Sequence, residues 1–574
     1  MTNEIIANIL KNIGIYLEME NISFKPRAYE KAAEVIDGLS DDVKEIYKKG
    51  GLKALEDLPG IGVSIAEHIE ELLKTGRLKY YENLKKKMPV DLEDLKSIEG
   101  LGPKTIKILY KKLKIKDIKD LEKAVKAGKI RNLSGFGIKS EENISKGIEF
   151  LKKTSGRFVL GFIMPLINEI ESRLKKLKEV DRITVAGSVR RKKETIGDAD
   201  FLIISDNPKP VMDFFINMPE VAQVFAHGKT KSAVKMKNGL DVDLRVFSEK
   251  SYGAALNYFT GSRDHNVELR GIAIKNGYKL NEYGLFKGKK QIAGRTEEEL
   301  YKALGLRYIE PELREMRGEI KASKSGKLPD LIGYEDLRGD LQVQSNWTDG
   351  AHSIEEMAKA AMAMGLEYIA ITDHTKRLAM THGLDEKRIQ KQWQGIDKIN
   401  KGFRVRGLGF RILKGTECDI LKDGSMDLPD KILAKCDVVG ASVHSLFNLS
   451  KKDQTQRIKR AMSNSNVDII FHPTGRVINK RDAYDIDMEE IIKHAKKTKT
   501  ILEINAFPDR ADLKDEYIKK CVEMGVKMAI DSDAHSIDHL KYLEYGIAQA
   551  RRGWAEKKNI INAWPLEKML NLLK

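Results

Sequence analysis

The spacing of apolar residues changes twice along this 574-residue chain, and each change predicts a different kind of fold. Up to about residue 150, apolar residues recur every three or four positions, which indicates helices. The next region contains three segments with the spacing of strands, namely Ile183–Val185, Phe201–Ile204 and Asp241–Val246. After the polar stretch Lys321–Pro329, short apolar strands alternate with helical patterns, which is typical of β/α units around a parallel sheet. The chain is too long for one core, so we expect several domains.

The composition is that of a globular protein with a basic surface. The formal net charge is +17. A basic excess suits a polyanion such as nucleic acid, although a Lys/Glu-rich surface that serves solubility in a heat-adapted host would give the same count. The three cysteines have no paired spacing, which argues against disulfides and thiolate zinc sites and favours a reducing cytoplasm. The sequence shows no signal pattern and no apolar stretch of about 18 residues, so we expect no membrane partner.

One glycine-rich turn recurs three times within the helical region. The glycine pairs are Gly60 and Gly62, Gly100 and Gly102, and Gly135 and Gly137. Glycine lets a ligand approach the backbone closely, and the free N–H groups at the start of the next helix suit a phosphate oxygen. Lys104 follows the second turn and adds a positive charge. One such turn is more often a plain helix connection, but three copies resemble the helix-hairpin-helix motif, which binds the DNA backbone without reading its sequence.

Three aspartates are predicted to meet on neighbouring strands. Asp198 and Asp200 lie two positions apart, so their side chains project from the same face of one strand. Asp243 lies on the polar face of a second strand, and a neighbouring position would bring it beside the pair. Carboxylates this close resist joint ionisation unless cations bind them, and hard oxygen ligands favour Mg²⁺ or Mn²⁺. Two such ions about 4 Å apart can stabilise both oxygens of a phosphoryl transfer. The alternative is an exposed strand with solvated aspartates.

The surrounding motifs resemble those of the family X DNA polymerases, the group of DNA polymerase beta. In order they are Gly187-Ser-x-x-Arg191, Gly197-Asp-x-Asp200, Val242-Asp-Leu-Arg245 and Tyr258-Phe-Thr-Gly261, and the resemblance covers residues 1–320. It implies that Asp198, Asp200 and Asp243 are catalytic ligands of two Mg²⁺ or Mn²⁺ ions. The residues that it implies around the incoming nucleotide and its base pair are Gly187, Ser188, Arg191, Gly197, Tyr258, Phe259, Gly261, Asn266 and Arg270. The implied partners are dNTPs and gapped or primer-template DNA, and we expect a monomer.

One departure from this family concerns its lyase members, which carry a Schiff-base lysine where this chain has His68. An imidazole cannot form the imine that an amine forms, which argues against deoxyribose-phosphate lyase activity. Lys25 and Tyr29 match positions on the 5′-phosphate side, so the resemblance still implies 5′-phosphate binding in a gap.

Histidines and carboxylates follow short apolar strands in the last part of the chain. The residues at these five strand ends are Asp373 and His374, Glu417, His444, His472, and Asp533 and His535. In a β/α barrel the carboxyl ends of the strands form one mouth, so residues distant in sequence converge there. A single histidine at a strand end is usually a satisfied polar residue, but this many repeats predict a metal centre.

This pattern resembles the polymerase and histidinol phosphatase (PHP) domain over roughly residues 336–574. The resemblance implies a distorted (β/α)7 barrel that binds up to three ions, with Zn²⁺ or Mn²⁺ expected, and that activates water against a phosphoester. The matching ligand positions are Gln342, Gln344, Asp349, His374, Glu417, His444, His472, Asp533 and His535. In the bacterial and archaeal family X enzymes this domain supplies a 3′→5′ exonuclease.

The first ligand motif departs from the pattern, because Gln342 and Gln344 stand where the domain usually has histidines. A neutral amide is a weaker ligand for Zn²⁺ or Mn²⁺ than an imidazole. Gln344 falls on the position expected to be kept, so we expect reduced metal occupancy and a weak or absent nuclease. Two origins are open, a natural difference of lineage and a deliberate substitution, and the ligand-type residues at the other seven positions favour the second.

The sequence as a whole predicts a multidomain α/β protein. The expected parts are two helical helix-hairpin-helix domains (1–80 and 81–150), a catalytic palm with a mixed sheet (151–248), a small thumb-like domain that selects the nucleotide (249–320), a linker (321–335) and the PHP barrel (336–574). The leading hypothesis is a polymerase that fills short gaps in base excision repair. A phosphoesterase that uses the rest of the chain to dock DNA is second, and a non-enzymatic DNA-binding scaffold is third.

Overall fold

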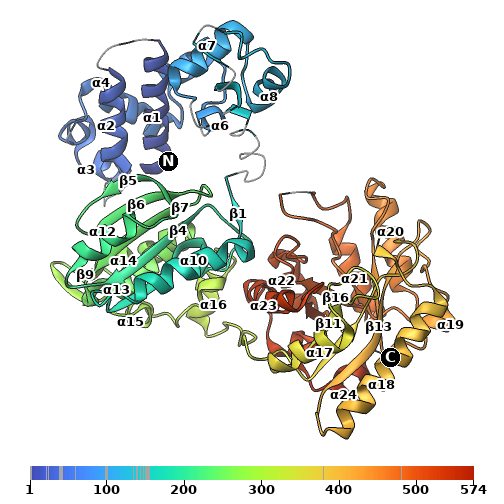
Figure 1. Cartoon of the computed structure of the whole chain (residues 1–574). Coiled ribbons are helices and arrows are strands. Elements are labelled where there is room, and N and C mark those ends of the chain that lie inside the picture. Colours follow the sequence, from blue (N-terminus) through green and yellow to red (C-terminus); the bar gives the residue numbers. More distant parts are fainter. Residues whose placement is uncertain are drawn as a thin grey trace. The chain divides into compact units, whose positions relative to one another are not determined.

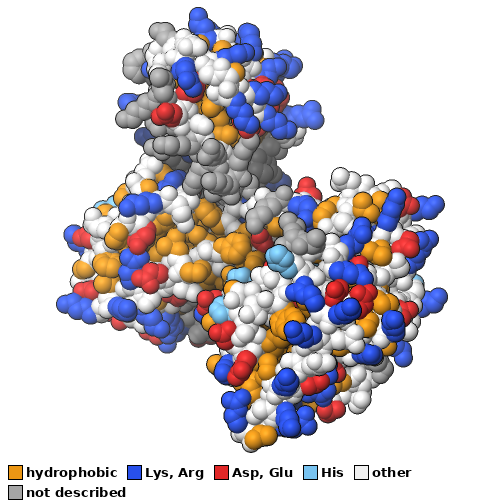
Figure 2. Space-filling view, turned by 45° about the vertical axis from the view of Figure 1, so that its right-hand side comes forward, with side chains coloured by type: hydrophobic (Ala, Val, Ile, Leu, Met, Phe, Trp, Pro, Cys, Tyr) orange, Lys and Arg blue, Asp and Glu red, His pale blue; other side chains and the backbone are white. Residues whose placement is uncertain are grey.

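The protein divides into two compact units, Met1–Gly156 and Arg157–Lys574 (Figure 1). The computed structural model describes residues 3–573 except 21, 23–24, 38–42, 59, 97, 99–100, 134, 138–139, 143, 146–147, 149–155, 379–380 and 480. Lys and Arg side chains are distributed over both units in the face that Figure 2 shows, as the net charge of +17 leads one to expect. No helix among the described residues is long and apolar enough to cross a membrane.

The first unit is built from helices alone among its described residues. They are α1 (Asn3–Met19), α2 (Lys25–Asp37), α3 (Val43–Glu56), α4 (Val63–Thr75), α5 (Lys79–Lys87), α6 (Leu92–Lys96), α7 (Pro103–Leu113) and α8 (Ile118–Lys126). Their apolar faces share one core, which includes Leu10, Ile69 and Leu109. The helical spacing read from the sequence therefore predicted this unit correctly.

The second unit begins with a mixed sheet, which we call the palm sheet. Its elements are β1 (Phe158–Val159), α10 (Leu160–Lys175), β2 (Arg182–Val185), α11 (Gly187–Arg190), β3 (Thr195–Ile196), β4 (Asp198–Ile204), α12 (Pro208–Ile216), β5 (Val221–His227), β6 (Lys231–Met236) and β7 (Asp241–Phe247). Five strands lie in the order β2-β4-β7-β6-β5, with β4 and β7 parallel and the other pairs antiparallel. The three predicted strand segments lie within β2, β4 and β7.

A small domain, which we call the thumb, follows the palm sheet. Its elements are η1 (Glu249–Ser251), α13 (Tyr252–Thr260), α14 (Arg263–Lys275), β8 (Lys279–Asn281), β9 (Gly284–Lys287), β10 (Lys290–Ala293), α15 (Glu297–Ala303), η2 (Pro311–Leu313) and α16 (Glu319–Ser325). Its strands form an antiparallel sheet in the order β10-β9-β8. Helix α16 includes the first five residues of the segment expected as a linker, and it ends at Gly326 in a left-handed conformation.

The last part of the chain is a parallel barrel. Its strands are β11 (Gly339–Val343), β12 (Tyr368–Ile371), β13 (Arg411–Asp419), β14 (Val438–Ser442), β15 (Ile469–Ile470), β16 (Ile501–Asn505) and β17 (Met528–Asp531). Its helices are α17 (Ile354–Ala363), α18 (Glu386–Val405), α19 (Asp430–Leu433), α20 (Lys451–Met462), α21 (Met488–Thr498), α22 (Asp515–Met524), η4 (Ile537–Tyr542), α23 (Leu543–Arg552), η5 (Lys557–Asn559), η6 (Ile561–Ala563) and α24 (Leu566–Leu573).

The seven strands of the barrel pair in the order of the sequence. Beyond the ends of β11 and β17, the Gln344 N–H donates to the Ala534 carbonyl at 2.8 Å, so the first and last strands lie together. Apolar side chains pack between the strands and the surrounding helices, and a second group that includes Leu341, Phe471 and Met569 forms a separate core. The predicted fold class, a helical region followed by a mixed sheet, a thumb and a (β/α)7 barrel, is confirmed.

Candidate functional site

The three aspartates of the palm sheet lie side by side. Strands β4 and β7 pair in parallel with Asp198 opposite Asp241 and Asp200 opposite Asp243. The alternate residues Ala199 and Phe201 are buried, which leaves the aspartates on the other face. The strand neighbourhood expected for Asp243 is therefore confirmed.

Burial and the charges of its neighbours Asp198 and Asp243 raise the pKa of Asp200 to about 7. The pKa of Asp198 is raised as well, because of partial burial and the charges of Asp243 and Asp241. Asp243 is partly neutralised, since Arg245 Nη2 and Lys231 Nζ lie 2.9 and 3.3 Å from its Oδ2. A cluster of carboxylates that repel one another fits divalent cations with oxygen ligands.

Gly187 lies against Asp200 of the carboxylate cluster. It has a left-handed backbone conformation with φ of +65°, and a Cβ at this position would lie 3.0 Å from Asp200 Oδ2. Glycine is therefore required for the close approach of this turn to the aspartate. Ser188 is half-buried in the short helix α11, and Gly197 immediately precedes β4. The structure thus places Gly187 against Asp200, with Ser188 next in the same turn, while Gly197 is the neighbour of Asp198 in the chain.

Arg191 joins this turn to the thumb. Its Nε lies 2.9 Å from Glu315 Oε1, and its Nη1 donates to the Thr260 carbonyl. A Cβ at Gly261 would lie 3.2 Å from Arg191 Nη1, so the predicted phosphate-binding arginine and Gly261 are in contact. Arg190, for which no role was predicted, pairs with the buried Glu297 at 2.6 Å.

The other predicted nucleotide-site residues lie on helices α13 and α14. Asn266 Nδ2 donates to the Tyr258 carbonyl at 2.6 Å, and Tyr258 is 38% exposed. Phe259 packs under the Arg245 guanidinium, whose centre lies 4.6 Å from the ring centroid. Arg245 therefore connects Phe259 with Asp243, a link that the motif Val242-Asp-Leu-Arg245 did not predict. Arg270 is half-buried on α14, one residue after the buried Leu269.

Two of the predicted hairpin glycines, Gly62 and Gly102, lead directly into helices. Gly62 precedes α4 and Gly102 precedes α7 as N-terminal caps, and Lys104 lies in the first turn of α7. Gly60 and Gly135 have φ of +80° and +87°. Open space surrounds the Cβ positions of Gly62, Gly102, Gly135 and Gly137, so these turns are accessible to a backbone phosphate. Gly100 lies outside the described residues.

His68 lies in an aromatic environment beside the predicted 5′-phosphate residues. Its Nδ1 is 2.9 Å from the Tyr29 hydroxyl, and its ring stacks on Tyr80 at 4.9 Å between centroids. Burial lowers the pKa of His68. Lys25 is exposed at the start of α2. The position expected for a lyase lysine is thus a neutral ring that serves as a hydrogen-bonding and stacking surface.

The barrel mouth holds a second centre, which we call the barrel centre. Glu417 Oε1 lies 2.9 Å from His472 Nε2 and 3.1 Å from His444 Nε2, and Glu417 Oε2 lies 3.5 Å from His374 Nδ1. Although burial disfavours its charged form, the charges of His374 and His444 hold the pKa of Glu417 well below its usual range. Burial opposes the charged form of His444 too, but hydrogen bonds with Asp419 and Glu417 raise its pKa to about 9.

Five of the predicted ligands of the barrel centre form two overlapping groups, and His472 and Asp533 belong to neither. His374, Glu417 and His444 make one, and Asp349, His374 and His535 make the other, with ligand atoms within 4.8 Å of one another in each. His374 belongs to both, which is suitable for two neighbouring ions. The Nδ1 atoms of His374 and His472 are buried without a hydrogen-bond partner. Buried donor atoms left open in this way fit a metal centre of His and carboxylate ligands.

Gln342 and Gln344 are fully buried at the same mouth. Gln344 Nε2 donates to Glu417 Oε2 at 2.9 Å, while its Oε1 has no hydrogen-bond partner. Gln342 Oε1 accepts from Asn505 Nδ2 at 3.1 Å. The amide of Gln344 is therefore hydrogen-bonded to Glu417 Oε2, the same carboxylate oxygen that lies near His374.

Three further residues near the ligands were missed by the sequence reading. Asn505 Nδ2 lies 3.2 Å from Asp533 Oδ2, and Arg510 Nε lies 3.2 Å from the same oxygen. Glu503 is buried, and its pKa is raised well above its usual value by burial and by the charges of Asp531 and Asp533. The Asn505 and Glu503 side chains come from β16, whose end carried no histidine and was therefore not counted as a ligand strand.

Models of known families match four segments of the chain. They are a helix-hairpin-helix domain over residues 1–78, a SAM-like helix-hairpin-helix tandem over 92–149, the DNA polymerase beta thumb over 255–315 and the PHP domain over 340–507. The matches follow one another in the order in which the structure shows a helical unit, a thumb and a barrel.

Relatives of known annotation resemble either the whole chain or one of its parts. The "DNA polymerase/3'-5' exonuclease PolX" of Bacillus subtilis is 38% identical over 99% of both chains. A "Probable phosphatase" of Thermoanaerobacter is 33% identical over 32% of this chain and 72% of its own length. "DNA polymerase lambda" of Arabidopsis thaliana is 24% identical over 50% of this chain and 58% of its own. The full-length match, together with the domain matches, shows that the chain belongs to the family X DNA polymerases with helix-hairpin-helix, thumb and PHP domains.

Proposed function

We propose that this protein is a DNA-directed DNA polymerase that adds dNTPs to a primer 3′ end and fills short gaps in base excision repair. The observation that carries the proposal is the parallel register of β4 and β7, which brings Asp198, Asp200 and Asp243 together on one face. Two Mg²⁺ or Mn²⁺ ions held by these aspartates would activate the primer hydroxyl and stabilise the leaving pyrophosphate.

The residues around the aspartates have roles that follow from their contacts. Gly187 leaves room beside Asp200, and Ser188 and Arg191 lie in the next turn of the chain, where they can hold the triphosphate. Arg191 is paired with Glu315, so its guanidinium would exchange the carboxylate oxygens of Glu315 for phosphate oxygens when a triphosphate binds. Tyr258, Phe259 and Gly261 form the surface for the deoxyribose. Asn266 and Arg270 lie on α14, where they can contact the new base pair and the template.

The first unit supports binding to gapped DNA. Gly62 and Gly102 have open space around their Cβ positions at the starts of α4 and α7, where backbone N–H groups can bind phosphates on either side of a gap. Lys25 and Tyr29 are assigned to the 5′-phosphate, and His68 supports this surface as a neutral ring hydrogen-bonded to Tyr29. We expect weak or no lyase activity, because the position of the Schiff-base lysine is held by the imidazole of His68, which cannot form an imine as an amine does.

For the barrel centre we propose a 3′→5′ exonuclease of weakened metal affinity. Zn²⁺ or Mn²⁺ bound by Asp349, His374, Glu417, His444, His472, Asp533 and His535 would activate water against the terminal phosphodiester. Gln344 donates a hydrogen bond to Glu417 Oε2, so this oxygen is engaged by an amide where the family pattern would offer an imidazole ligand. The protein would thus retain a metal centre with fewer strong ligands.

Primer extension on a one-nucleotide gap with Mg²⁺ tests the polymerase proposal. Asp243→Ala should abolish nucleotide addition. Asp241→Ala, on the same strand and exposed, is the matched control and should extend within a few-fold of wild type, because Asp241 acts on Asp198 through its charge alone and its contact with Lys235 is a surface ion pair. Unchanged extension by Asp243→Ala would falsify the proposal.

A further inference from the structure

A buried arginine joins the barrel to the palm sheet. Arg476 is 5% exposed, and its Nη1 and Nη2 lie 3.1 and 2.6 Å from the two carboxylate oxygens of Glu194, which precedes β3. The same guanidinium donates to the carbonyl oxygens of Arg510, at 2.9 Å, and Ala511. Because the planar guanidinium holds its donors in a rigid geometry, Arg476 fixes the Glu194 carboxylate and the two loop carbonyls relative to each other. One barrel side chain therefore connects a palm carboxylate with the loop after β16.

The loop after β16, residues 506–512, is held in an unusual backbone conformation. Ala511 has φ of +41°, a region that residues other than glycine rarely adopt. A conformation of this kind persists only where its surroundings hold it. Arg476 supplies part of that support through the Ala511 carbonyl, and Asp512 supplies more through hydrogen bonds from the backbone N–H groups of Thr474 and Gly475 at 2.9 and 3.0 Å.

This loop and the residue before it supply two partners of one proposed metal ligand. Asp533 Oδ2 lies 3.2 Å from Asn505 Nδ2 and 3.2 Å from Arg510 Nε. Both contacts engage Oδ2, and they leave Oδ1 as the oxygen that faces His535, at 3.9 Å from His535 Nδ1. The position of Asp533 in the barrel centre thus depends on where the loop lies.

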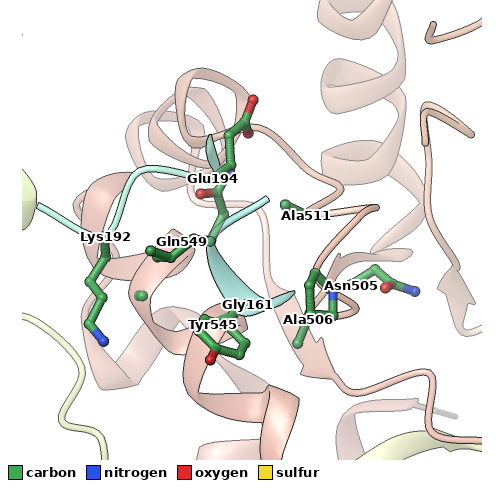
Figure 3. A pocket seen from close by; sticks show the side chains of 11 residues that line it. Gly161, Lys192, Glu194, Asn505, Ala506, Ala511, Tyr545 and Gln549 are labelled. Atoms are coloured by element: carbon green, nitrogen blue, oxygen red, sulfur yellow. The ribbon is translucent and has the colours of Figure 1, made fainter. Parts of the chain in front are cut away.

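The palm sheet also packs directly on the loop. A Cβ at Gly161, in the first turn of α10, would lie 2.5 Å from the ring of Pro508, so only glycine admits this approach. The rings of Phe162 and Phe507 meet edge to face at 6.4 Å. The cavity that remains between the two domains measures about 20 Å³, room for a single water. Figure 3 shows Glu194 and Gly161 on one side of this cavity and Ala506 and Ala511 on the other.

We propose that Glu194 and Arg476 are positioning residues of the barrel centre, so that the palm sheet completes the support of the phosphoesterase. Glu194 orients Arg476, Arg476 holds the carbonyls of the loop, and the loop presents Asn505 and Arg510 to Asp533. This inference rests on the proposed function of the barrel centre. It predicts that a barrel freed from the palm carboxylate binds its metals more weakly although all of its ligands are present.

The experiment compares the full chain with three variants of the palm–barrel contact and with His374→Ala, which identifies the binding step of the barrel centre. Glu194→Ala removes the palm acceptor, and Arg476→Lys keeps the charge but loses the fork that reaches the two carbonyls. Asn479→Ala is the matched control, because the Asn479 amide donates to the Arg157 carbonyl at 3.4 Å and also connects the barrel with the palm side. Three measurements are made: Mn²⁺ titration calorimetry, hydrogen–deuterium exchange of residues 506–512, and hydrolysis of bis(p-nitrophenyl) phosphate.

Glu194→Ala and Arg476→Lys should each speed exchange in the loop and weaken Mn²⁺ binding about tenfold, while Asn479→Ala changes neither. The relevant binding step is the one that His374→Ala removes. Hydrolysis should fall at limiting Mn²⁺ and recover at saturating Mn²⁺, a rescue that general unfolding would not allow. The inference is overturned if loop exchange is unchanged in both variants, or if it rises while Mn²⁺ affinity stays within twofold of wild type. If His374→Ala removes no bound Mn²⁺ from the wild-type chain, the metal centre itself is refuted, and the inference with it.

Discussion

The palm aspartates and the barrel centre both hold carboxylates whose negative charge has to be compensated, and they compensate it in different ways. In the palm, the three carboxylates stand on the face of a sheet and are partly open to solvent, with Arg245 and Lys231 as their nearest cations. In the barrel, Glu417 is 1% exposed and hydrogen-bonds with imidazoles that come from other strand ends.

The difference in exposure predicts how readily each centre would exchange its metal ions. An open carboxylate cluster gains cations readily with an incoming triphosphate and releases them with pyrophosphate, because hydrated Mg²⁺ exchanges its partners. A buried cluster with imidazole ligands would hold its ions between turnovers, because few waters reach it and imidazole nitrogens suit Zn²⁺ well.

The largest effect is expected at the palm. Asp200→Asn should lower the rate of nucleotide addition on gapped DNA by about 1,000-fold or more, because several kcal/mol of metal-borne stabilisation are lost. Single-turnover primer extension measures this rate. Mn²⁺ binding at the barrel centre should stay unchanged in the same variant, and a parallel loss there would show that the two centres are not separate.

Glu417→Gln is the converse change. It removes the negative charge that joins three imidazoles in the barrel centre, so we expect tight Mn²⁺ binding and 3′→5′ digestion of a single-stranded oligonucleotide to fall by about 100-fold. Primer extension should remain within twofold of wild type. If extension falls as strongly as digestion, the barrel contributes to polymerisation and the two centres do not act separately.

Gln344→His is expected to strengthen the barrel centre. An imidazole in place of the amide adds a strong ligand and frees Glu417 Oε2, so Mn²⁺ affinity should rise about tenfold, equivalent to ~1.4 kcal/mol. Exonuclease activity with Mn²⁺ should rise with it. Gln344→Asn, which keeps an amide, is the control, and no gain from the histidine variant would refute the proposal that Gln344 limits this site.

The smallest effect concerns pH in the metal-free protein. The pKa of Asp200 is raised to about 7, so its neutral form stabilises the fold below pH 3.8 and this stability is lost as the pH rises through 7. The pKa of His444 is raised to about 9, so its contribution is complete below pH 6.5 and is lost as the pH rises through 9. In EDTA, the melting temperature should fall by about 2–4 °C in each window.

Two variants show which residue is responsible for each pH window. Asp200→Asn should flatten only the lower part of the melting profile, and His444→Gln only the upper part. A single window shared by both variants would mean that the centres titrate together.

Much of the fold could be predicted because its signals are local. The two-residue spacing of Asp198 and Asp200 predicted one face of a strand, and repeated strand ends with histidines predicted a common mouth. Contacts between distant segments could not be predicted in this way. Arg476 and Glu194 are 282 positions apart, and neither lies in a pattern with a period.

The same reasoning explains what was missed around the ligands. Asn505 and Arg510 support Asp533 through contacts that depend on the shape of a loop rather than on the type of residue at a strand end. The partner of Arg191 was missed for a similar reason, since Glu315 belongs to the thumb and meets it only after the chain has folded. Long-range pairs of charges need the tertiary structure to be found.

The closure of β11 against β17 has a consequence for protein synthesis. The strands of the barrel are made in the same order in which they stand, and Gln344 of the first segment bonds to Ala534 just after the last. Asp349 can meet His535 only after both have left the ribosome, whereas the three palm aspartates are complete some 290 residues earlier. A prematurely terminated chain that still folds its palm would therefore be a polymerase core with no nuclease beside it.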